Sequence, residues 1–317
     1  MVTLDDIRAA QVRIAGRVHR TPLMYSSALA ARAGVASVAL KCESFQKTGS
    51  FKVRGSLNKL AQLSEEQRAR GVICASAGNH AQALAWCARA AGVHCTVVMP
   101  MTASKTKLAA SRDYGAEVIQ FGTPKDIFGK AFEIAEERGM TFVHPFDDDA
   151  IIAGAGTAGL EMLEQMERLP DVVITPVGGG GLIAGIAVAV KALAPDARHY
   201  GVEPTGANTM RMSFDAGSAM RADSISTIAD GLAAPMTGER NYEIAREFVD
   251  DIIIVTDEQI AEAMHVLLER CKLLTEPAGA TSAAALLSGS IELRPTDHVA
   301  LVVSGGNVDA EKLKQLL

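Results

Sequence analysis

The stretch Thr175–Gly185, TPVGGGGLIAG, decides the fold class. It begins at the end of an apolar run, continues with four consecutive glycines, Gly178 to Gly181, and leads into an apolar helical pattern from Leu182. Four glycines in a row lose more conformational entropy on folding than an ordinary turn requires. The economical interpretation is therefore a nest of backbone N–H groups that binds a phosphate at a helix N-terminus. It is not a P-loop, because no Gly-Lys-Ser/Thr follows the glycines.

Short apolar runs like the one before the glycines recur along the chain and alternate with helical patterns. Runs that are apolar throughout are typical of strands covered on both faces, and their alternation with helices indicates parallel sheets. The predicted fold class is therefore α/β. The predicted strands are Val38–Cys42, Val72–Ala75, Cys95–Met99, Glu117–Phe121, Val172–Thr175, His199–Glu203, Ile252–Val255 and His298–Val303. Helices are predicted between them, among others at Ala81–Ala91, Lys105–Tyr114, Ile127–Arg138, Gly159–Glu167, Leu182–Ala194 and Glu258–Leu273.

The composition is that of a globular chain. Its 317 residues, 48% of them hydrophobic, correspond to about two domains at the usual ~150 residues each. The 31 basic and 37 acidic residues give a net charge of −6 without a basic cluster, so no nucleic acid and no anionic membrane is expected as a partner. The longest apolar stretch, Gly178–Val190, is too short and too rich in glycine to cross a membrane.

The N-terminus and the cysteines bear on the compartment. The first residues, MVTLDDIRAA, are acidic and amphipathic and do not resemble a signal peptide. The five cysteines contain no C-x-x-C pair, and four of them lie in apolar stretches where a cysteine is typically a small buried hydrophobic residue. Both features predict a cytoplasmic protein in a reducing environment.

Three other segments contain residues suited to binding or catalysis. In Lys47–Ser56, KTGSFKVRGS, Lys52 stands among glycines and serines. A lone lysine is ordinarily a solvated surface residue, and a nucleophilic lysine needs desolvation that a sequence does not reveal. In Ala75–Ala85, ASAGNHAQALA, small residues follow a strand and open a helix, which suits either an anion site or a plain turn capped by Asn79. In the segment SGGN, Ser304 follows the last buried strand, at the sheet edge where ligands bind.

Other familiar motifs are absent or lack their context. The glycines of GAGTAG, Gly154, Gly156 and Gly159, match G-x-G-x-x-G, but a loop-like HPFDDD precedes them instead of a strand, so we reject a dinucleotide site. The seven histidines show no H-x-H or H-x-x-x-H spacing, and the chain contains no G-x-S-x-G.

Taken together and in this order, SFKVRGS, SAGNHAQA, GGGGL and SGGN resemble the motifs of the fold-type-II pyridoxal-phosphate enzymes, most closely the threonine/serine dehydratase and serine racemase group. The resemblance runs from Arg20 to Asn307. It implies two parallel-sheet domains in a tryptophan-synthase-β-like fold. Residues 1–62 plus 145–317 would form the large cofactor-binding domain, and residues 63–144 a small mobile domain. It also implies a homodimer or homotetramer, and since the chain stops soon after SGGN, no C-terminal regulatory domain is expected.

The resemblance also implies roles for individual residues. Lys52 is the catalytic residue, which carries pyridoxal 5'-phosphate and removes the Cα proton of the substrate. The other cofactor-binding residues are Phe51, Asn79, Gly178, Gly179, Gly180, Gly181, Leu182 and Ser304. The substrate binds at Ser76, Ala77, Gly78 and His80, the turn that would hold its carboxylate.

The activity implied by the resemblance is β-elimination, the dehydration and deamination of L-threonine and L-serine to a 2-oxo acid and ammonia. The alternatives are a dehydratase of another 3-hydroxy amino acid, phenylserine or 3-hydroxyaspartate, and a serine racemase. A non-enzyme alternative is an amino-acid-binding regulatory protein, against which Lys52 argues.

At three positions the sequence differs from residues that are found in some enzymes of the group that it resembles. Glu203 and Ala207 match two ligands of a divalent cation found in some of them, but Thr209 replaces an aspartate. Because one charged ligand is lost, we expect a monovalent, a weakly bound divalent or no cation. Phe128 stands where racemase and hydroxyaspartate relatives carry an arginine, which disfavours an acidic β-substituent. Ala77 stands where a racemase has the serine that protonates the opposite face of Cα.

Overall fold

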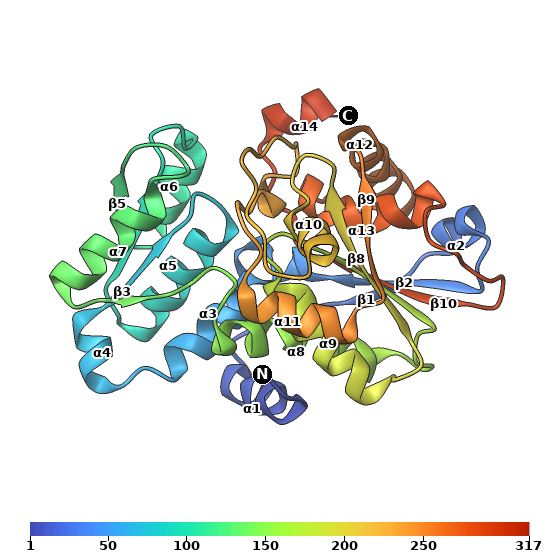
Figure 1. Ribbon diagram of the computed structural model, residues 1–317, viewed down its shortest axis with the longest axis horizontal. Helices are drawn as coiled ribbons and strands as arrows, with labels where there is room; N and C mark the ends of the chain where they lie inside the picture. Colours follow the sequence, from blue (N-terminus) through green and yellow to red (C-terminus); the bar gives the residue numbers. More distant parts are fainter. Residues whose placement is uncertain (317) are drawn as a thin grey trace.

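The computed structural model describes residues 1–316, whose strands form two sheets (Figure 1). The larger sheet contains, in spatial order, β1 (Leu23–Tyr25), β2 (Ser37–Cys42), β10 (His298–Val303), β7 (Val172–Pro176), β8 (Arg198–Pro204) and β9 (Asp251–Val255). Neighbouring strands of this sheet run parallel, except that the edge strand β1 is antiparallel to β2. The carboxyl ends of the parallel strands therefore meet at one edge of the sheet.

The smaller sheet is built from one continuous part of the chain. Its strands, all parallel, are in spatial order β5 (Glu117–Gln120), β4 (Cys95–Met99), β3 (Val72–Ala75) and β6 (Thr141–Phe142). Helix α5 (Asn79–Ala91) packs on one face of this sheet, and α7 (Ile127–Arg138) packs on the other.

Helices cover both faces of the larger sheet as well. On one face lie α8 (Asp149–Gln165) and α9 (Gly181–Leu193), and on the other lie α2 (Ser27–Ala33), α12 (Asp257–Val266) and α13 (Pro277–Ser288). The remaining α-helices are α1 (Leu4–Ile14), α3 (Lys52–Ala61), α4 (Glu65–Arg70), α6 (Lys105–Asp113), α10 (Thr209–Ala216), α11 (Glu239–Phe248) and α14 (Ala310–Leu316).

The predicted α/β fold with parallel sheets is confirmed. Every strand predicted from an apolar run is present. The strands in the middle of each sheet are covered on both faces, since all five residues of β4 and all five of β7 are buried. Helix α1 (Leu4–Ile14) begins with a capping box, in which the Thr3 side chain accepts from the Asp6 amide and the Asp6 carboxylate accepts from the Thr3 amide.

One helix is longer than predicted. We expected a helix from Gly159, whereas α8 begins at Asp149, capped by Asp148, so GAGTAG lies inside a helix. The glycines there serve close packing: a Cβ at Gly154 would lie 2.6 Å from the Cα of Gly55 in α3, and a Cβ at Gly156 would lie 2.8 Å from a carbonyl oxygen of α9. A pattern of small residues does not distinguish such helix crossings from a loop.

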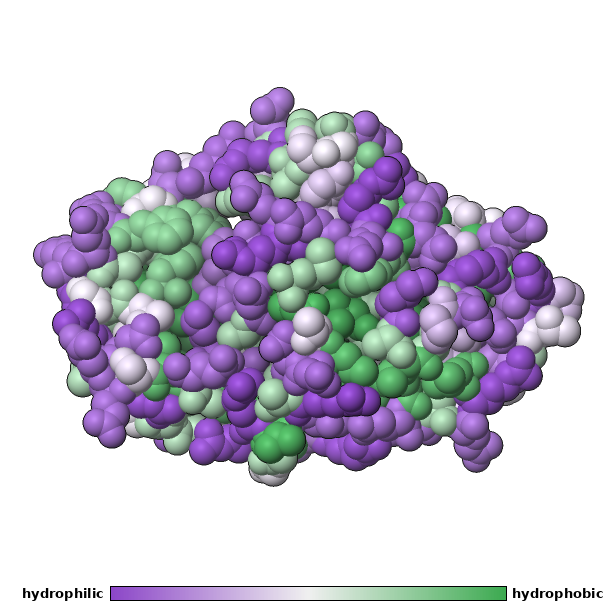
Figure 2. Space-filling view, turned by 60° about the horizontal axis from the view of Figure 1, so that its bottom comes forward, coloured by the Kyte–Doolittle hydropathy of each residue, from purple (hydrophilic) through white to green (hydrophobic). Residues whose placement is uncertain are grey.

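The surface is mostly polar. Figure 2 shows one face on which hydrophilic residues surround two apolar areas, one toward the smaller sheet and one toward the larger. The large exposed hydrophobic side chains include Phe121 and Phe132. Within residues 1–316, no helix is both long enough and apolar enough to cross a membrane.

Candidate active site

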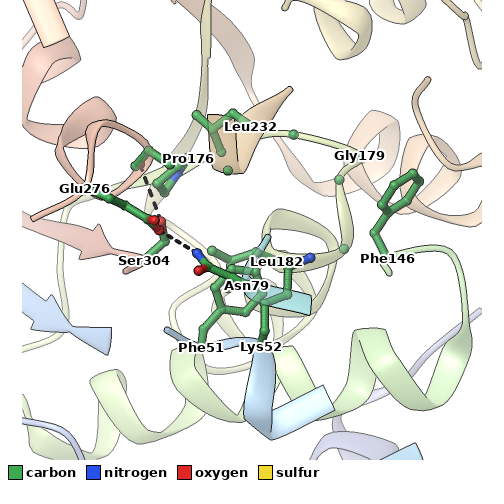
Figure 3. A pocket seen from close by; sticks show the side chains of 15 residues that line it. Phe51, Lys52, Asn79, Phe146, Pro176, Gly179, Leu182, Leu232, Glu276 and Ser304 are labelled. Atoms are coloured by element: carbon green, nitrogen blue, oxygen red, sulfur yellow. Dashed lines mark hydrogen bonds between the residues drawn. The ribbon is translucent and has the colours of Figure 1, made fainter. Parts of the chain in front are cut away.

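One pocket lies at the carboxyl edge of the larger sheet (Figure 3). Its wall is formed by the loop between β7 and α9, the end of β10, and the first residues of α3, α5 and α13. The chain segments that meet there are far apart in the sequence, and each contributes either the end of a strand or the start of a helix. This is the position where ligands bind in parallel sheets.

The structure brings together the residues that were predicted to bind the cofactor. All of them line this one pocket, namely Phe51, Lys52, Asn79, Gly178, Gly179, Gly180, Gly181, Leu182 and Ser304. The residues predicted to bind the substrate, Ser76, Ala77, Gly78 and His80, form the adjoining turn before and at the start of α5 and do not line the pocket itself.

The glycine loop leaves no room for side chains on its protein side. A Cβ at Gly179 would lie 2.4 Å from the ring of Phe146, and a Cβ at Gly181 would lie 2.8 Å from the carbonyl oxygen of Phe146. Gly180 has a φ of +98°, which favours glycine. Within residues 1–316, the amides of Gly178, Gly179 and Gly180 donate no hydrogen bond to the protein. Free amides before the N-terminus of α9 fit the phosphate of the implied cofactor.

Lys52 combines a fixed position with a lowered basicity. It is the first residue of α3, and its Nζ donates to the carbonyl oxygen of Pro145 at 2.8 Å. Burial lowers the pKa of Lys52 to about 8, although the carboxylate of Glu276 acts in the opposite direction. At pH 7 roughly a tenth of the amine is therefore neutral, far more than for an exposed lysine, and the neutral amine is the form that acts as a nucleophile or a base. The structure thus shows the desolvation of the Lys52 amine that a nucleophilic lysine needs and that the sequence does not reveal.

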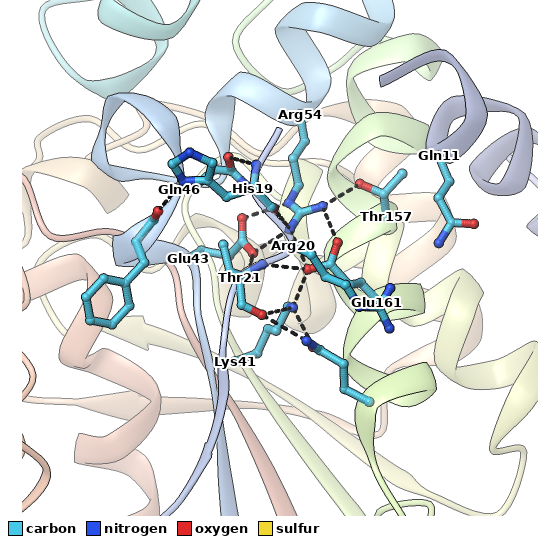
Figure 4. Close-up of polar contacts among 12 residues, drawn as sticks. Gln11, His19, Arg20, Thr21, Lys41, Glu43, Gln46, Arg54, Thr157 and Glu161 are labelled. Carbon is cyan, nitrogen blue, oxygen red and sulfur yellow. Dashed lines mark hydrogen bonds and ion pairs between the residues drawn. The ribbon is translucent and has the colours of Figure 1, made fainter. Parts of the chain in front are cut away.

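A buried ionic cluster anchors the helix that carries Lys52 (Figure 4). Arg54 donates to both oxygens of Glu43 at 2.8 Å and to Glu161 at 3.1 Å. The Nζ of Lys41 lies 2.5 Å from the same oxygen of Glu161. Because removal of one partner from such a buried group costs about 3–5 kcal/mol, the cluster ties α3 firmly to β2 and α8. It thereby holds Lys52 in its place.

The turn between β3 and α5 is ordered by its own polar groups. The Oγ of Ser76 accepts from the amide of Gly78 at 3.2 Å. Burial lowers the pKa of His80 to about 3, so its ring is neutral at physiological pH. The Nε2 of His80 lies 3.1 Å from the carbonyl oxygen of Val143, which can only accept, so the ring proton is on Nε2. The Nδ1 of His80 has no partner within residues 1–316.

Six residues that line the pocket were not predicted from the sequence, namely Phe146, Pro176, Gly231, Leu232, Glu276 and Ala278. Phe146 packs beneath the glycine loop, and Glu276 is 7% exposed and accepts from the Nδ2 of Asn79 at 2.7 Å. Burial raises the pKa of Glu276 to about 7. The one available hint was Pro277 directly after Glu276, since proline favours the first turn of a helix and helices begin at this edge of the sheet.

Glu203, one of the two residues considered for a cation, is engaged by the backbone. Both carboxylate oxygens of Glu203 accept from backbone amides, those of Met210 at 2.9 Å and Arg211 at 2.8 Å, at the start of α10. Ala207 is buried in the preceding turn, outside the pocket. Within residues 1–316, no three His, Cys, Asp or Glu side chains form a group that could hold a metal ion. The geometry thus explains Glu203 as a cap of α10.

Comparisons with known proteins agree on one group of enzymes. Residues 14–305 match the model of a family described as pyridoxal-phosphate dependent enzymes. The chain is 45% identical over 323 residues to an L-threonine ammonia-lyase of Thermotoga maritima, an alignment that spans 100% of this chain and 78% of that protein.

Two solved structures are also similar. A threonine deaminase of T.th. is 44% identical with a TM-score of 0.91, over 97% of this chain and 99% of that one. A serine racemase of maize is 39% identical with a TM-score of 0.94, over 99% of this chain and 96% of that one.

Proposed function

The chain belongs to the family of pyridoxal-phosphate-dependent enzymes, and from that premise we propose that it is an ammonia-lyase for L-threonine and L-serine. Its cofactor is pyridoxal 5'-phosphate. The similarity to a threonine ammonia-lyase and a threonine deaminase over nearly the whole chain supports elimination of water and ammonia as the reaction. One observation carries the proposal: the amine of Lys52 and the glycine cradle face the same pocket.

Within the pocket, each residue has a task that its surroundings suit. When bound, the cofactor supplies an electron sink for charge that develops at Cα of the amino acid. Lys52, with a pKa of about 8, accepts the Cα proton as the general base. The amides of the glycine loop would hold the phosphate, and the hydroxyl group of Ser304 would form a hydrogen bond with the pyridine nitrogen. The proton from Cα and the β-hydroxyl leave together as one water. Hydrolysis of the remaining enamine, through its imine tautomer, takes up one water and yields the 2-oxo acid and ammonia.

The turn from Ser76 to His80 is the proposed site of the substrate carboxylate. It includes the pocket residue Asn79, and the first amides of α5 point out of the helix there without intrahelical partners. Free amides at a helix N-terminus favour an anion. The neutral ring of His80 adds no competing charge.

We further propose that residues 63–144 move as a small domain and that residues 1–62 with 145–317 form the large one. The smaller sheet lies wholly within the first range, which supports this division. One ion pair crosses between the parts: Lys107 of α6 lies 3.2 Å from Asp230, next to the pocket residue Gly231. Such a half-exposed pair contributes little stability, which suits a contact that opens and closes.

The proposed substrate preference rests on the absence of positive charge at Phe128 and at its neighbour His144. The ring of Phe128 packs against that of His144 at 5.7 Å, and burial lowers the pKa of His144 to about 4, so neither side chain is cationic at neutral pH. A second carboxylate would stay unpaired there, at a cost of several kcal/mol. We expect kcat/KM for L-threonine and L-serine, with phenylserine also accepted, to exceed that for 3-hydroxyaspartate at least ~10-fold.

Formation of 2-oxo acid and ammonia from these four substrates tests the proposal. A higher kcat/KM for 3-hydroxyaspartate than for L-threonine would contradict the assignment of the β-substituent pocket. If no substrate released ammonia from the holoenzyme, the lyase function itself would be wrong.

The reaction type depends on Ala77. Racemisation requires a proton donor on the face of Cα opposite Lys52, and the methyl group of Ala77 has no proton to give. We therefore expect negligible D-serine from L-serine in the wild type. Ala77→Ser should produce detectable D-serine with some loss of the dehydratase rate, measured by chiral chromatography. Ala77→Gly is the matched control, since it changes the packing without adding a hydroxyl group, and it should form no D-serine.

We propose a homodimer or homotetramer in the cytoplasm, with a small amino acid as substrate and without nucleic acid or membrane as partner. The apolar areas in Figure 2 and the exposed rings of Phe121 and Phe132 support association of subunits. Since both oxygens of Glu203 are engaged by backbone amides, any cation at Glu203 and Ala207 would be weakly bound or monovalent.

A further inference from the structure

A chain of hydrogen bonds leads from the surface into the pocket. The Nδ2 of Asn307 donates to the carbonyl oxygen of Thr48 at 2.7 Å and to the Oδ1 of Asn79 at 2.9 Å. The Nδ2 of Asn79 in turn donates to the Oε1 of Glu276 at 2.7 Å, and Figure 3 shows these two side chains meeting at the wall of the pocket. The three side chains come from β10–α14, α5 and α13, so the contact joins remote segments.

The chemistry of the two ends fixes the direction of every bond between them. The carbonyl oxygen of Thr48 can only accept, so the amide nitrogen of Asn307 must face it, and the second hydrogen of that nitrogen reaches Asn79. Asn79 must therefore present its oxygen to Asn307 and its nitrogen to Glu276. If the amide of Asn79 were rotated by half a turn, its nitrogen would face the nitrogen of Asn307, and its oxygen would face the carboxylate of Glu276. Both contacts would be unfavourable.

At each end of this series of hydrogen bonds, a glycine lets the backbone approach the side chain of Glu276 or Asn307 closely. A Cβ at Gly305 would lie 2.2 Å from the Oε1 of Glu276. A Cβ at Gly49 would lie 2.2 Å from the Oδ1 of Asn307, and Gly49 has a φ of +74°. Thr48, which supplies the terminal carbonyl, also has a positive φ of 60°. A non-glycine residue in this conformation costs energy, so the surrounding contacts must hold it there.

From this geometry we infer that Glu276 and Asn307 are positioning residues, which hold the amide of Asn79 so that one N–H faces the cofactor. Asn79 has two N–H donors, and Glu276 takes one of them. The other has no partner within residues 1–316, and Asn79 lines the pocket. The inference rests on the proposed function in one respect, namely that Asn79 bonds the ring hydroxyl of the cofactor.

A double-mutant cycle on cofactor affinity tests the inference. Apoenzyme is titrated with pyridoxal 5'-phosphate, and Kd is measured for the wild type, Glu276→Met, Asn79→Ala and the double variant. Methionine has a similar length but no oxygen that could accept the N–H of Asn79. If Glu276 acts through Asn79, Glu276→Met weakens binding roughly tenfold in the wild-type background and by less than about twofold in the Asn79→Ala background. Equal losses in both backgrounds would overturn the inference, because Glu276 would then act independently of Asn79.

A second pair of variants keeps the test valid if Glu276→Met folds poorly. Asn307 is exposed, so Asn307→Ala should leave the melting temperature of the apoenzyme unchanged and still weaken cofactor binding, again not in the Asn79→Ala background. An unchanged Kd in Asn307→Ala would contradict the inference. Glu292→Gln is the matched control, since this exposed carboxyl lies outside the pocket and its loss should not alter Kd. If wild-type apoenzyme does not bind the cofactor at all, the proposed function fails instead.

Discussion

Lys52→Ala is expected to abolish ammonia release from L-threonine and to remove the visible absorption band of the lysine-bound cofactor. Loss of the general base alone lowers turnover by about 10²–10⁴-fold, and loss of the covalent link to the cofactor adds to this. The glycine loop is untouched, so the variant should still bind pyridoxal 5'-phosphate, without the band.

Absorption spectra and initial rates of 2-oxo acid formation measure both effects. Lys47→Ala is the matched control: it removes a lysine from the same segment, whose Nζ lies 5.3 Å from the centre of the Trp86 ring, away from the pocket. It should retain the band and most of the turnover. Near-normal ammonia release by Lys52→Ala would show that the base and the anchor have been assigned to the wrong residue.

Gly179→Ala is expected to weaken cofactor binding more than tenfold. The added Cβ would lie 2.4 Å from the ring of Phe146, which is itself buried, so either the ring or the loop must move. Such overpacking typically costs about 1–3 kcal/mol, and the displaced amides no longer converge on the phosphate.

Titration of the apoenzyme with the cofactor and thermal unfolding check this prediction. Gly129→Ala is the control, because a Cβ there meets nothing within 4 Å and its position inside α7 favours alanine. It should leave the Kd for the cofactor unchanged and raise stability slightly. A Gly179→Ala variant that binds the cofactor as tightly as the wild type would rule out a role for the tight glycine cradle.

Most of the fold was predictable from the sequence because it depends on local pattern. The central strands are continuous apolar runs, and β3, β4 and β10 have the predicted bounds. The antiparallel strand β1 has three residues and β6 has two, too few for a period to be visible. The start of α8 was not predicted because its small residues are required by close packing against Gly55 of α3, which is distant in the sequence.

In the site as well, residues within local motifs could be predicted, whereas those that matter through contacts distant in sequence could not. Lys52, Asn79 and the glycine loop belong to motifs with characteristic neighbours, and the structure brings them into one pocket. Glu276 has no such motif, since its importance arises from contact with Asn79, which lies far away in the chain. The lowered pKa of Lys52 is likewise a consequence of burial by remote segments, so only the folded structure contains it.

The products formed from L-threonine by the wild-type holoenzyme test the central claim most directly. Purified protein loaded with pyridoxal 5'-phosphate is incubated with L-threonine, and 2-oxobutanoate, ammonia and remaining threonine are quantified together. We expect 2-oxobutanoate and ammonia in equal amounts that account for all threonine consumed, with no change in the configuration of the threonine that remains. Threonine that changes configuration at Cα, or that is bound without any release of ammonia, would contradict the assignment of this chain as an ammonia-lyase.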